Sequence, residues 1–158
     1  MFEFREADHS YWLLGRRMES VTEILSSSGI ADYRWSNEEA MTRGKYVHTA
    51  TEMIDRGTLD WTILDDTLRP YCEAYQSFIE DKRPEILLSE KPMYHPQHLF
   101  AGTPDRVMRM DDSIILPDLK SGAPTRATPI QVSAYRELVS VSEGISCRKM
   151  FALHLKNN

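Results

Sequence analysis

The hydrophobic and polar positions of the first thirty residues indicate short elements. Residues 1–17 have the pattern of a β-hairpin or a pair of extended segments, ending at Gly15 and the arginines. Ser20-Val-Thr-Glu23 has the spacing of a capping box, in which each side chain accepts a hydrogen bond from the other residue's main-chain N–H. We therefore expect a short helix that begins here and continues through about Leu25.

Two longer helical patterns follow. Ser36-Asn-Glu-Glu39 is a second capping box and predicts a helix that ends at Gly57. Its apolar positions return at helical spacing, at Ala40, Val47, Ala50 and Ile54. The next apolar stripe is the clearest in the chain, and Pro70 is compatible with it because proline fits the first turn of a helix. This stripe consists of Leu68, Tyr71, Cys72, Tyr75, Phe78 and Ile79.

Beyond Pro84 the pattern changes to that of strands. Residues 86–94, 100–110 and 113–120 are rich in β-branched and apolar side chains, with a tight turn expected at Asp111-Asp112. Thr128-Pro-Ile-Gln131 is a third capping box and predicts a helix through about Val139, and residues 147–155 form a last strand. This order predicts an α/β or α+β fold in which helices flank a mixed central β-sheet.

Length and composition limit the organisation and location of the protein. A chain of 158 residues fits one domain with its own core, and 41% hydrophobic and 27% charged residues are typical of a soluble protein. No apolar run is long enough for a membrane span, and the acidic N-terminal residues do not fit a secretory signal. Cys72 and Cys147 fit reduced thiols, so we expect a cytoplasmic protein without a membrane partner.

The formal net charge of −5 argues at first against a nucleic-acid partner, because phosphate binding relies on lysine and arginine. An enzyme with acidic metal ligands can nevertheless be acidic overall while keeping a local basic groove, so the distribution of charge decides. Small basic groups lie near the motifs described next, and solvated surface charge is the alternative interpretation. They are Arg16 with Arg17, Arg43 with Lys45, Arg106 with Arg109, and Lys120 with Arg126.

The candidate chemistry centres on Gly102-Thr-Pro-Asp105, followed thirteen residues later by Asp118-Leu-Lys120. In a hairpin this spacing brings Asp105 and Asp118 to the same end of two strands, and Asp118 and Lys120 leave the same face. Carboxylates supply the oxygen ligands that Mg²⁺ needs, while a lysine positions or deprotonates water and stabilises charge on phosphate. A solvated strand face is the alternative, but the apolar neighbours indicate an interior strand, where an unpaired charge is costly.

These motifs resemble those of a known family. Gly102-Thr-Pro-Asp105, Asp118-Leu-Lys-Ser-Gly122 and Gln131-x-x-x-Tyr135 are similar to successive motifs of the RecB-like branch of the PD-(D/E)xK nucleases. Upstream, Arg43-Gly44-x-x-x-His48-x-x-x-Glu52 resembles the helical histidine motif of that branch, and residues 11–25 resemble the opening of small phage-type members.

The resemblance implies one RecB-like nuclease domain over residues 1–158, with a restriction-endonuclease-like core. It implies a centre for Mg²⁺ or Mn²⁺ built by His48, Asp105, Asp118 and the main-chain carbonyl of Leu119, with Lys120 catalytic. Some relatives hold an iron-sulfur cluster through four cysteines. This chain has two, so we expect no such cluster.

Five candidate residues have an ordinary structural alternative beside the functional one. Glu52 and Glu90 are secondary candidates, for a second metal or for orienting a ligand, and an exposed role is the alternative. Gln131 fits a capping box and Tyr135 fits a core aromatic, whereas the resemblance favours a substrate-side role in which the pair contacts the DNA backbone. His48 alone fits a surface or core histidine, but it shares a helical face with Gly44 and Glu52.

We therefore expect a metal-dependent deoxyribonuclease that hydrolyses phosphodiester bonds, and first an exonuclease of phage recombination or DNA processing. A structure-specific or restriction-type endonuclease uses the same core and is the alternative. A non-catalytic DNA-binding protein with a nuclease fold is a third. The expected partners are DNA and either further copies of the chain or a recombination protein, in the host cytoplasm if the chain is phage-encoded.

Overall fold

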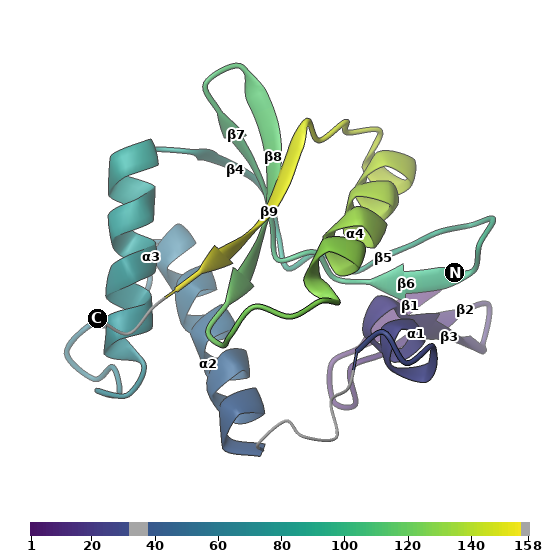
Figure 1. The fold of residues 1–158 in the computed structure, drawn as a ribbon, viewed down its shortest axis with the longest axis horizontal. Coiled ribbons are helices and arrows are strands. Elements are labelled where there is room, and N and C mark those ends of the chain that lie inside the picture. The colour runs from purple at the N-terminus through teal and green to yellow at the C-terminus, as the bar shows by residue number, and fades with distance from the viewer. Residues whose placement is uncertain (32–37, 156–158) are drawn as a thin grey trace.

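The computed structural model describes residues 1–31 and 38–155 and has an α+β architecture, as expected (Figure 1). The described strands form two mixed sheets, with five strands in the order β1-β2-β3-β6-β5 and four in the order β4-β7-β8-β9. The second capping box begins at Ser36, which lies outside the described residues. The longer helix that it was expected to open is described from Glu38 onward.

The five-stranded sheet begins with an antiparallel meander of β1 (Phe2–Arg5), β2 (Ser10–Leu13) and β3 (Arg16–Ser20). The expected hairpin is therefore extended by a third strand. β3 pairs in parallel with β6 (Phe100–Gly102), which pairs antiparallel with β5 (Met93–Tyr94).

The four-stranded sheet contains β4 (Glu85–Ser89), β7 (Arg106–Met110), β8 (Ser113–Lys120) and β9 (Lys149–His154). β7 and β8 form the expected hairpin, with Asp111 at a φ of 49° in its turn, and β9 runs parallel to β8. The expectation of one central sheet is wrong: each of the runs 86–94 and 100–110 is divided between the two sheets. The chain changes sheet at residues 90–92 and 103–105, where polar or proline residues interrupt the apolar runs.

The helices have clear starting points. α1 (Val21–Ser27) begins with the expected capping box of Ser20 and Glu23, which is confirmed. α2 spans Glu38–Asp55 and α3 spans Arg69–Lys82, with its proline in the first turn.

The capping box expected at the start of α4 (Thr128–Glu143) is wrong. The residue before the helix is Ala127, whose φ of −74° and ψ of −28° are already helical and which makes no side-chain cap. Thr128 therefore lies inside the first turn, where its hydroxyl contacts Thr125 Oγ1 at 3.0 Å. The side chain of Gln131 is thus free for the contacts described below.

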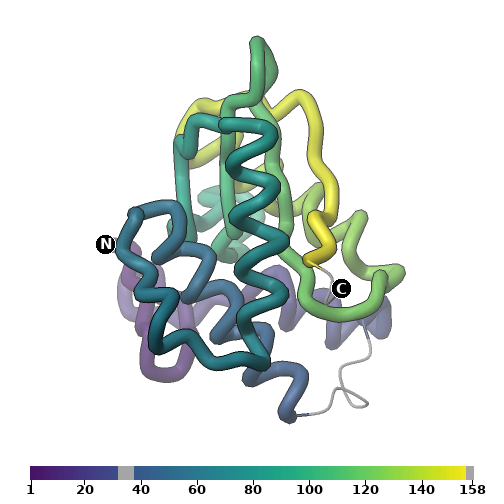
Figure 2. The backbone as a smooth tube through the Cα atoms, turned by 90° about the vertical axis from the view of Figure 1, so that its left-hand side faces the viewer, coloured from purple at the N-terminus to yellow at the C-terminus, as the bar shows by residue number. Residues whose placement is uncertain are grey.

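Helices cover both faces of the four-stranded sheet (Figure 1). Side chains of β8 alternate between the two sides, because successive residues of a strand point to opposite faces. Ile115 and Leu119 pack with residues of α2 and α3, and Leu116 packs with residues of α4. Figure 2 shows α3 running along the strands on the side of the sheet that α2 and α3 cover.

Cys72 and Cys147 are both buried as free thiols. None of the described helices has the length and apolar character needed to cross a membrane.

Gly102 lies where β6 packs closely against α4 and α1. A Cβ atom at this position would lie 2.8 Å from Tyr135 Cε1, 3.1 Å from Leu138 Cδ1 and 3.2 Å from Val21 Cγ2. These distances are too short for a methyl group, so only glycine lets α4 approach β6 this closely.

We predict that Gly102→Ala lowers the free energy of unfolding by about 1–3 kcal/mol, because the added methyl overpacks a core contact. Gly122→Ala is the matched control, since its Cβ would meet nothing within 4 Å. Urea unfolding of both variants measures the difference, and equal stability of the two would contradict the close contact.

Candidate metal centre

Asp105 and Asp118 are buried at the end of the β7–β8 hairpin opposite its turn, with 6% and 1% of their surface exposed. Asp105 directly precedes β7, and its Oδ2 accepts a hydrogen bond of 2.6 Å from the main-chain N–H of Leu119 in β8. The charge of Asp118 is close enough to raise the pKa of Asp105. The two carboxylates are therefore neighbours, as the spacing of the sequence predicted.

His48 of α2 joins Asp105 and the peptide of Leu119. Its Nδ1 lies 3.2 Å from Glu90 Oε1 and 3.4 Å from Asp105 Oδ1, while its Nε2 lies 3.2 Å from the Leu119 carbonyl oxygen. One ligand atom from each of His48, Glu90 and Asp105 lies within 4.8 Å of the other two. A nitrogen and two carboxylate oxygens at this spacing can share one divalent cation, and such a mixed set suits Mn²⁺ as well as Mg²⁺.

Glu90 reaches this group through an unusual backbone conformation. It follows β4 directly, has a φ of 46°, and its N–H donates to the carbonyl of Asp105 at 2.9 Å. A side chain at positive φ costs on the order of 1–3 kcal/mol and is often found at functional sites. The expected strand over 86–94 would have placed Glu90 in its interior, whereas the strand ends at Ser89.

The buried guanidinium of Arg106 contacts the group from the protein interior. Arg106 is 0% exposed, and its Nη1 donates to Glu90 Oε1 at 3.0 Å and to the Asp105 carbonyl at 2.7 Å. Its Nε donates to Asp55 Oδ2 at 2.5 Å and its Nη2 to Thr51 Oγ1 at 3.2 Å. The interpretation of Arg106 as part of a surface basic group is wrong, because its side chain is buried against Thr51 and Asp55 of α2 and against Glu90. Sequence reasoning did not identify Asp55, which its contacts with Arg106 and with the Tyr75 hydroxyl reveal.

Lys120 lies on the same strand face as Asp118. Its Nζ is 2.6 Å from Asp118 Oδ2, an oxygen with no hydrogen-bond partner among the described residues, so charge attraction holds this pair. Nζ also donates to Gln131 Oε1 at 3.1 Å, and Gln131 Nε2 donates to the Tyr135 hydroxyl at 3.2 Å. The lysine side chain is 26% exposed, which leaves its ammonium accessible beside the buried carboxylates.

Of the remaining candidates, Tyr135 contacts the site indirectly and Glu52 does not join it. Tyr135 is buried and packs in the core around α4, and burial together with the charges of Asp105 and Asp118 raises its pKa well above the ordinary value. Its contact with the site passes through Gln131. Glu52 does not join the group in the described structure: it pairs with Arg56 at 2.7 Å along α2.

The charges of the group favour the binding of additional positive charge. Burial lowers the pKa of His48, but Asp105 and Glu90 outweigh this and hold it at about 9. Burial raises the pKa of Asp105 to about 7, against the opposing charge of His48. Protonation therefore stabilises the metal-free group, and a divalent cation bound to the same atoms would replace that positive charge.

Comparison with known proteins gives no match: no protein-family model fits this sequence, and no curated protein matches it. The geometry of the site therefore carries the functional argument.

The pKa shifts predict how pH affects stability in EDTA. His48 has a folded pKa of about 9 against 6.5 for the free side chain, so its contribution is complete below pH 6.5 and is lost as pH rises through 9. Asp105 acts in the same direction at lower pH, because its folded pKa is also raised. We therefore expect Tm in EDTA to fall between about pH 7 and pH 9.

Excess Mn²⁺ should raise Tm, and the increase should grow over the same range because the metal binds the deprotonated ligands. His48→Asn is the control and should flatten the slope in EDTA. A Tm that rises with pH in EDTA would contradict the assigned protonation.

Proposed function

We propose that this protein is a divalent-metal-dependent DNA nuclease of the RecB-like PD-(D/E)xK kind, which hydrolyses phosphodiester bonds. The observation that carries the proposal is the convergence of His48, Glu90, Asp105 and the Leu119 carbonyl near the accessible ammonium of Lys120. The motif resemblance supports the same activity.

The donor set fits Mg²⁺ or Mn²⁺, which His48, Glu90 and Asp105 would hold, whereas the Leu119 carbonyl faces the other ring nitrogen of His48. Glu90 replaces Asp118 in the closest group, while Asp118 lies beside it and pairs with Lys120. A bound divalent ion would lower the pKa of a water molecule and offset charge on phosphate. Binding would also require His48 to release a proton, which favours activity at neutral to alkaline pH.

Lys120 has the properties of the group that meets the phosphate. Asp118 and Gln131 fix its ammonium from two sides, so its position is set before substrate binds. A fixed positive charge at developing negative charge on phosphate is the kind of interaction that stabilises a transition state. Asp118 acts here by positioning Lys120 and by adding negative charge next to the metal ligands.

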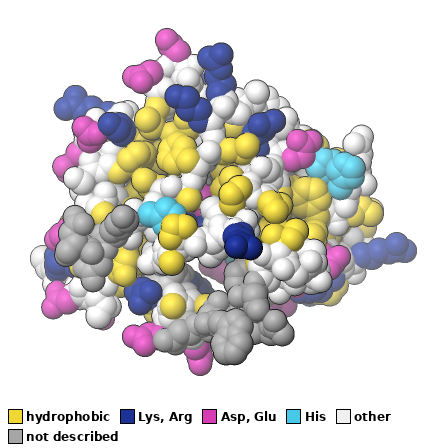
Figure 3. Space-filling view, in the orientation of Figure 1, with side chains coloured by type: hydrophobic (Ala, Val, Ile, Leu, Met, Phe, Trp, Pro, Cys, Tyr) yellow, Lys and Arg dark blue, Asp and Glu magenta, His cyan; other side chains and the backbone are white. Residues whose placement is uncertain are grey.

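The surface charge supports recognition that depends on the site more than on a basic groove. Figure 3 shows lysine and arginine side chains spread over this face, with acidic side chains among them. Together with the net charge of −5, this favours backbone and end recognition over extensive duplex binding. An exonuclease is the form of the activity that we propose first; the pathway and any protein partner stay predictions.

We predict that Asp105→Asn and Lys120→Ala separate metal binding from catalysis. Asp105→Asn should weaken Mn²⁺ binding and abolish cleavage, because it removes a charged ligand. Lys120→Ala should retain Mn²⁺ binding while the cleavage rate falls by about 10²–10³-fold, the usual effect of losing one transition-state donor.

Calorimetry with Mn²⁺ and single-turnover cleavage of labelled DNA measure the two quantities. Lys91→Ala, which removes a surface lysine paired with Glu143, is the matched control and should resemble the wild type. Equal loss of Mn²⁺ binding in the Asp105 and Lys120 variants would contradict the assigned roles.

A second prediction concerns the form of the substrate. Linear DNA should be degraded progressively with Mn²⁺ or Mg²⁺, and covalently closed circles should survive much longer, because recognition uses strand ends. Cleavage should also weaken steeply with salt. Gel analysis with end-labelled linear and circular DNA, with an EDTA control, tests this. Discrete internal products or rapid loss of circles would favour the endonuclease alternative and leave the metal centre intact.

A further inference from the structure

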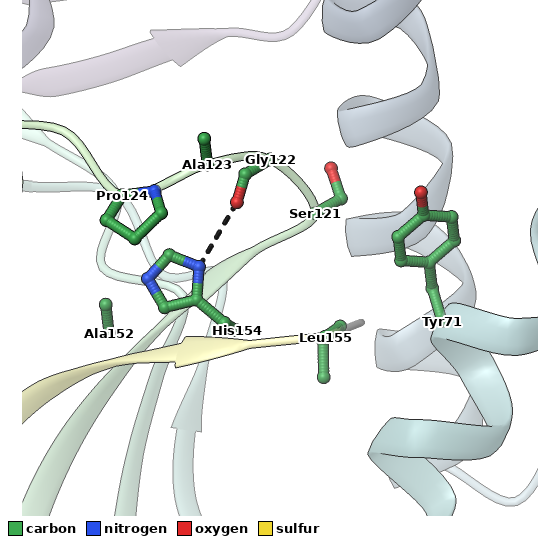
Figure 4. Close-up of a pocket in the computed structure, with 8 residues that line it drawn as sticks. All are labelled: Tyr71, Ser121, Gly122, Ala123, Pro124, Ala152, His154 and Leu155. Atoms are coloured by element: carbon green, nitrogen blue, oxygen red, sulfur yellow. Dashed lines mark hydrogen bonds between the residues drawn. The ribbon is translucent and has the colours of Figure 1, made fainter. Parts of the chain in front are cut away.

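A cavity of about 580 Å³ opens beside the catalytic end of β8, and nothing in the proposed chemistry uses it (Figure 4). Its volume lies within the range of ordinary small-molecule pockets. Its lining comes from the end of β9, the loop after β8 and the start of α3. The lining residues are Tyr71, Ser121, Gly122, Ala123, Pro124, Ala152, His154 and Leu155.

The register of β8 and β9 places two of the lining residues on the same face of the sheet as Asp118 and Lys120. Asp118 is paired with Ala152, and Lys120 with His154. Paired residues of neighbouring strands point to the same face, and neighbouring strands lie about 4.8 Å apart. The cavity wall therefore continues the surface of Asp118 and Lys120 by one strand, and the Leu155 N–H donates to the Lys120 carbonyl at 2.8 Å.

The lining combines flat apolar surfaces with a few polar groups. Figure 4 shows Pro124 and His154 on one side and the Tyr71 ring facing them from α3, with Ser121 between. His154 Nδ1 lies 3.1 Å from the Gly122 carbonyl oxygen and must carry the proton, because a carbonyl only accepts. His154 Nε2 is then an acceptor with no partner among the described residues. Such a lining suits a ring with polar edges better than a phosphate group alone.

The positively charged side chain of Arg43 lies at the Tyr71 side of the cavity. The guanidinium of Arg43 lies 5.8 Å from the centre of the Tyr71 ring, and its Nε is buried without a hydrogen-bond partner among the described residues. A buried donor without a partner is costly unless a ligand binds it. A phosphate linked to a nucleoside in the cavity would provide the missing acceptor.

We propose that this cavity is a nucleoside subsite, which takes the sugar and base of the nucleotide next to the phosphate that Lys120 meets. The proposal rests on the nuclease function above and names the part of the substrate that lies beside the metal centre. His154 and Ser121 bind polar edges of the nucleoside, Pro124 and Ala152 contact its flat faces, and Arg43 binds the adjoining phosphate. Small apolar residues accept any base, so binding at this subsite is independent of sequence.

The test uses thymidine 5′-monophosphate as the probe in EDTA, so that it does not depend on metal or on cleavage. The imidazole NMR signals of His154, assigned with His154→Asn, should shift saturably with the nucleotide. Inorganic phosphate at the same concentration should leave them in place. Ala123→Trp fills the cavity from an exposed loop position and should weaken nucleotide binding at least tenfold. Ala7→Trp, in the exposed turn between β1 and β2, is the matched control and should bind normally.

Each other outcome would overturn the subsite. Equal shifts with phosphate would show an anion site without a place for the nucleoside. An absent shift, or a shift unchanged by Ala123→Trp, would show that the nucleotide does not occupy the cavity. The nuclease proposal fails separately: a wild-type protein that binds the nucleotide here but cleaves no DNA with Mn²⁺ or Mg²⁺ would retain the subsite and lose the activity.

Discussion

The buried guanidinium of Arg106 is the interaction on which the arrangement of the site depends. It bonds Asp55 at the end of α2, Glu90 after β4 and the carbonyl of Asp105 before β7. An isolated charge at such depth would cost several kcal/mol, and two carboxylates with additional hydrogen bonds offset that cost. The same contacts make the burial of the carboxylates tolerable. Asp55 lies two turns after His48 on α2, so fixing Asp55 also fixes the height at which His48 meets the sheet.

The acidic centre is thus paired with a guanidinium on its buried side, and its accessible side has less positive charge than the carboxylates need. Arg106 pairs with both Asp55 and Glu90 on the buried side, while Lys120 pairs with Asp118 on the accessible side. Asp105, between them, has a raised pKa because burial and its acidic neighbours disfavour a further negative charge. At neutral pH the protonated His48 supplies a positive charge to this centre. In the proposed function a divalent cation takes the place of that charge and binds several carboxylates at once.

Much of the site was predictable from the sequence because strand geometry fixes it. Asp118 and Lys120 share a face through their two-residue spacing, and the hairpin brings Asp105 to them. The role of Glu90 was harder to predict, because the hydrophobic pattern does not reveal a residue with a left-handed backbone conformation at the end of a strand. Arg106 resembles a surface cation in the sequence, and only its partners on α2 and β4 explain its burial. The division into two sheets was missed because the changes of sheet fall inside runs that resemble continuous strands.

The division into two sheets explains what the N-terminal strands contribute. Residues 103–105 carry the chain from β6 of one sheet to β7 of the other, so Asp105 lies where the sheets meet. The hydroxyl of Tyr11 in β2 contacts Thr103 Oγ1 at 2.8 Å, which anchors this crossing from the five-stranded side. Gly102 lets Tyr135 pack directly against the crossing from α4, and Tyr135 in turn binds Gln131, which contacts Lys120. The meander and α4 therefore support the two ends of one motif, and a shared set of contacts positions the proposed ligand Asp105 and the ammonium of Lys120.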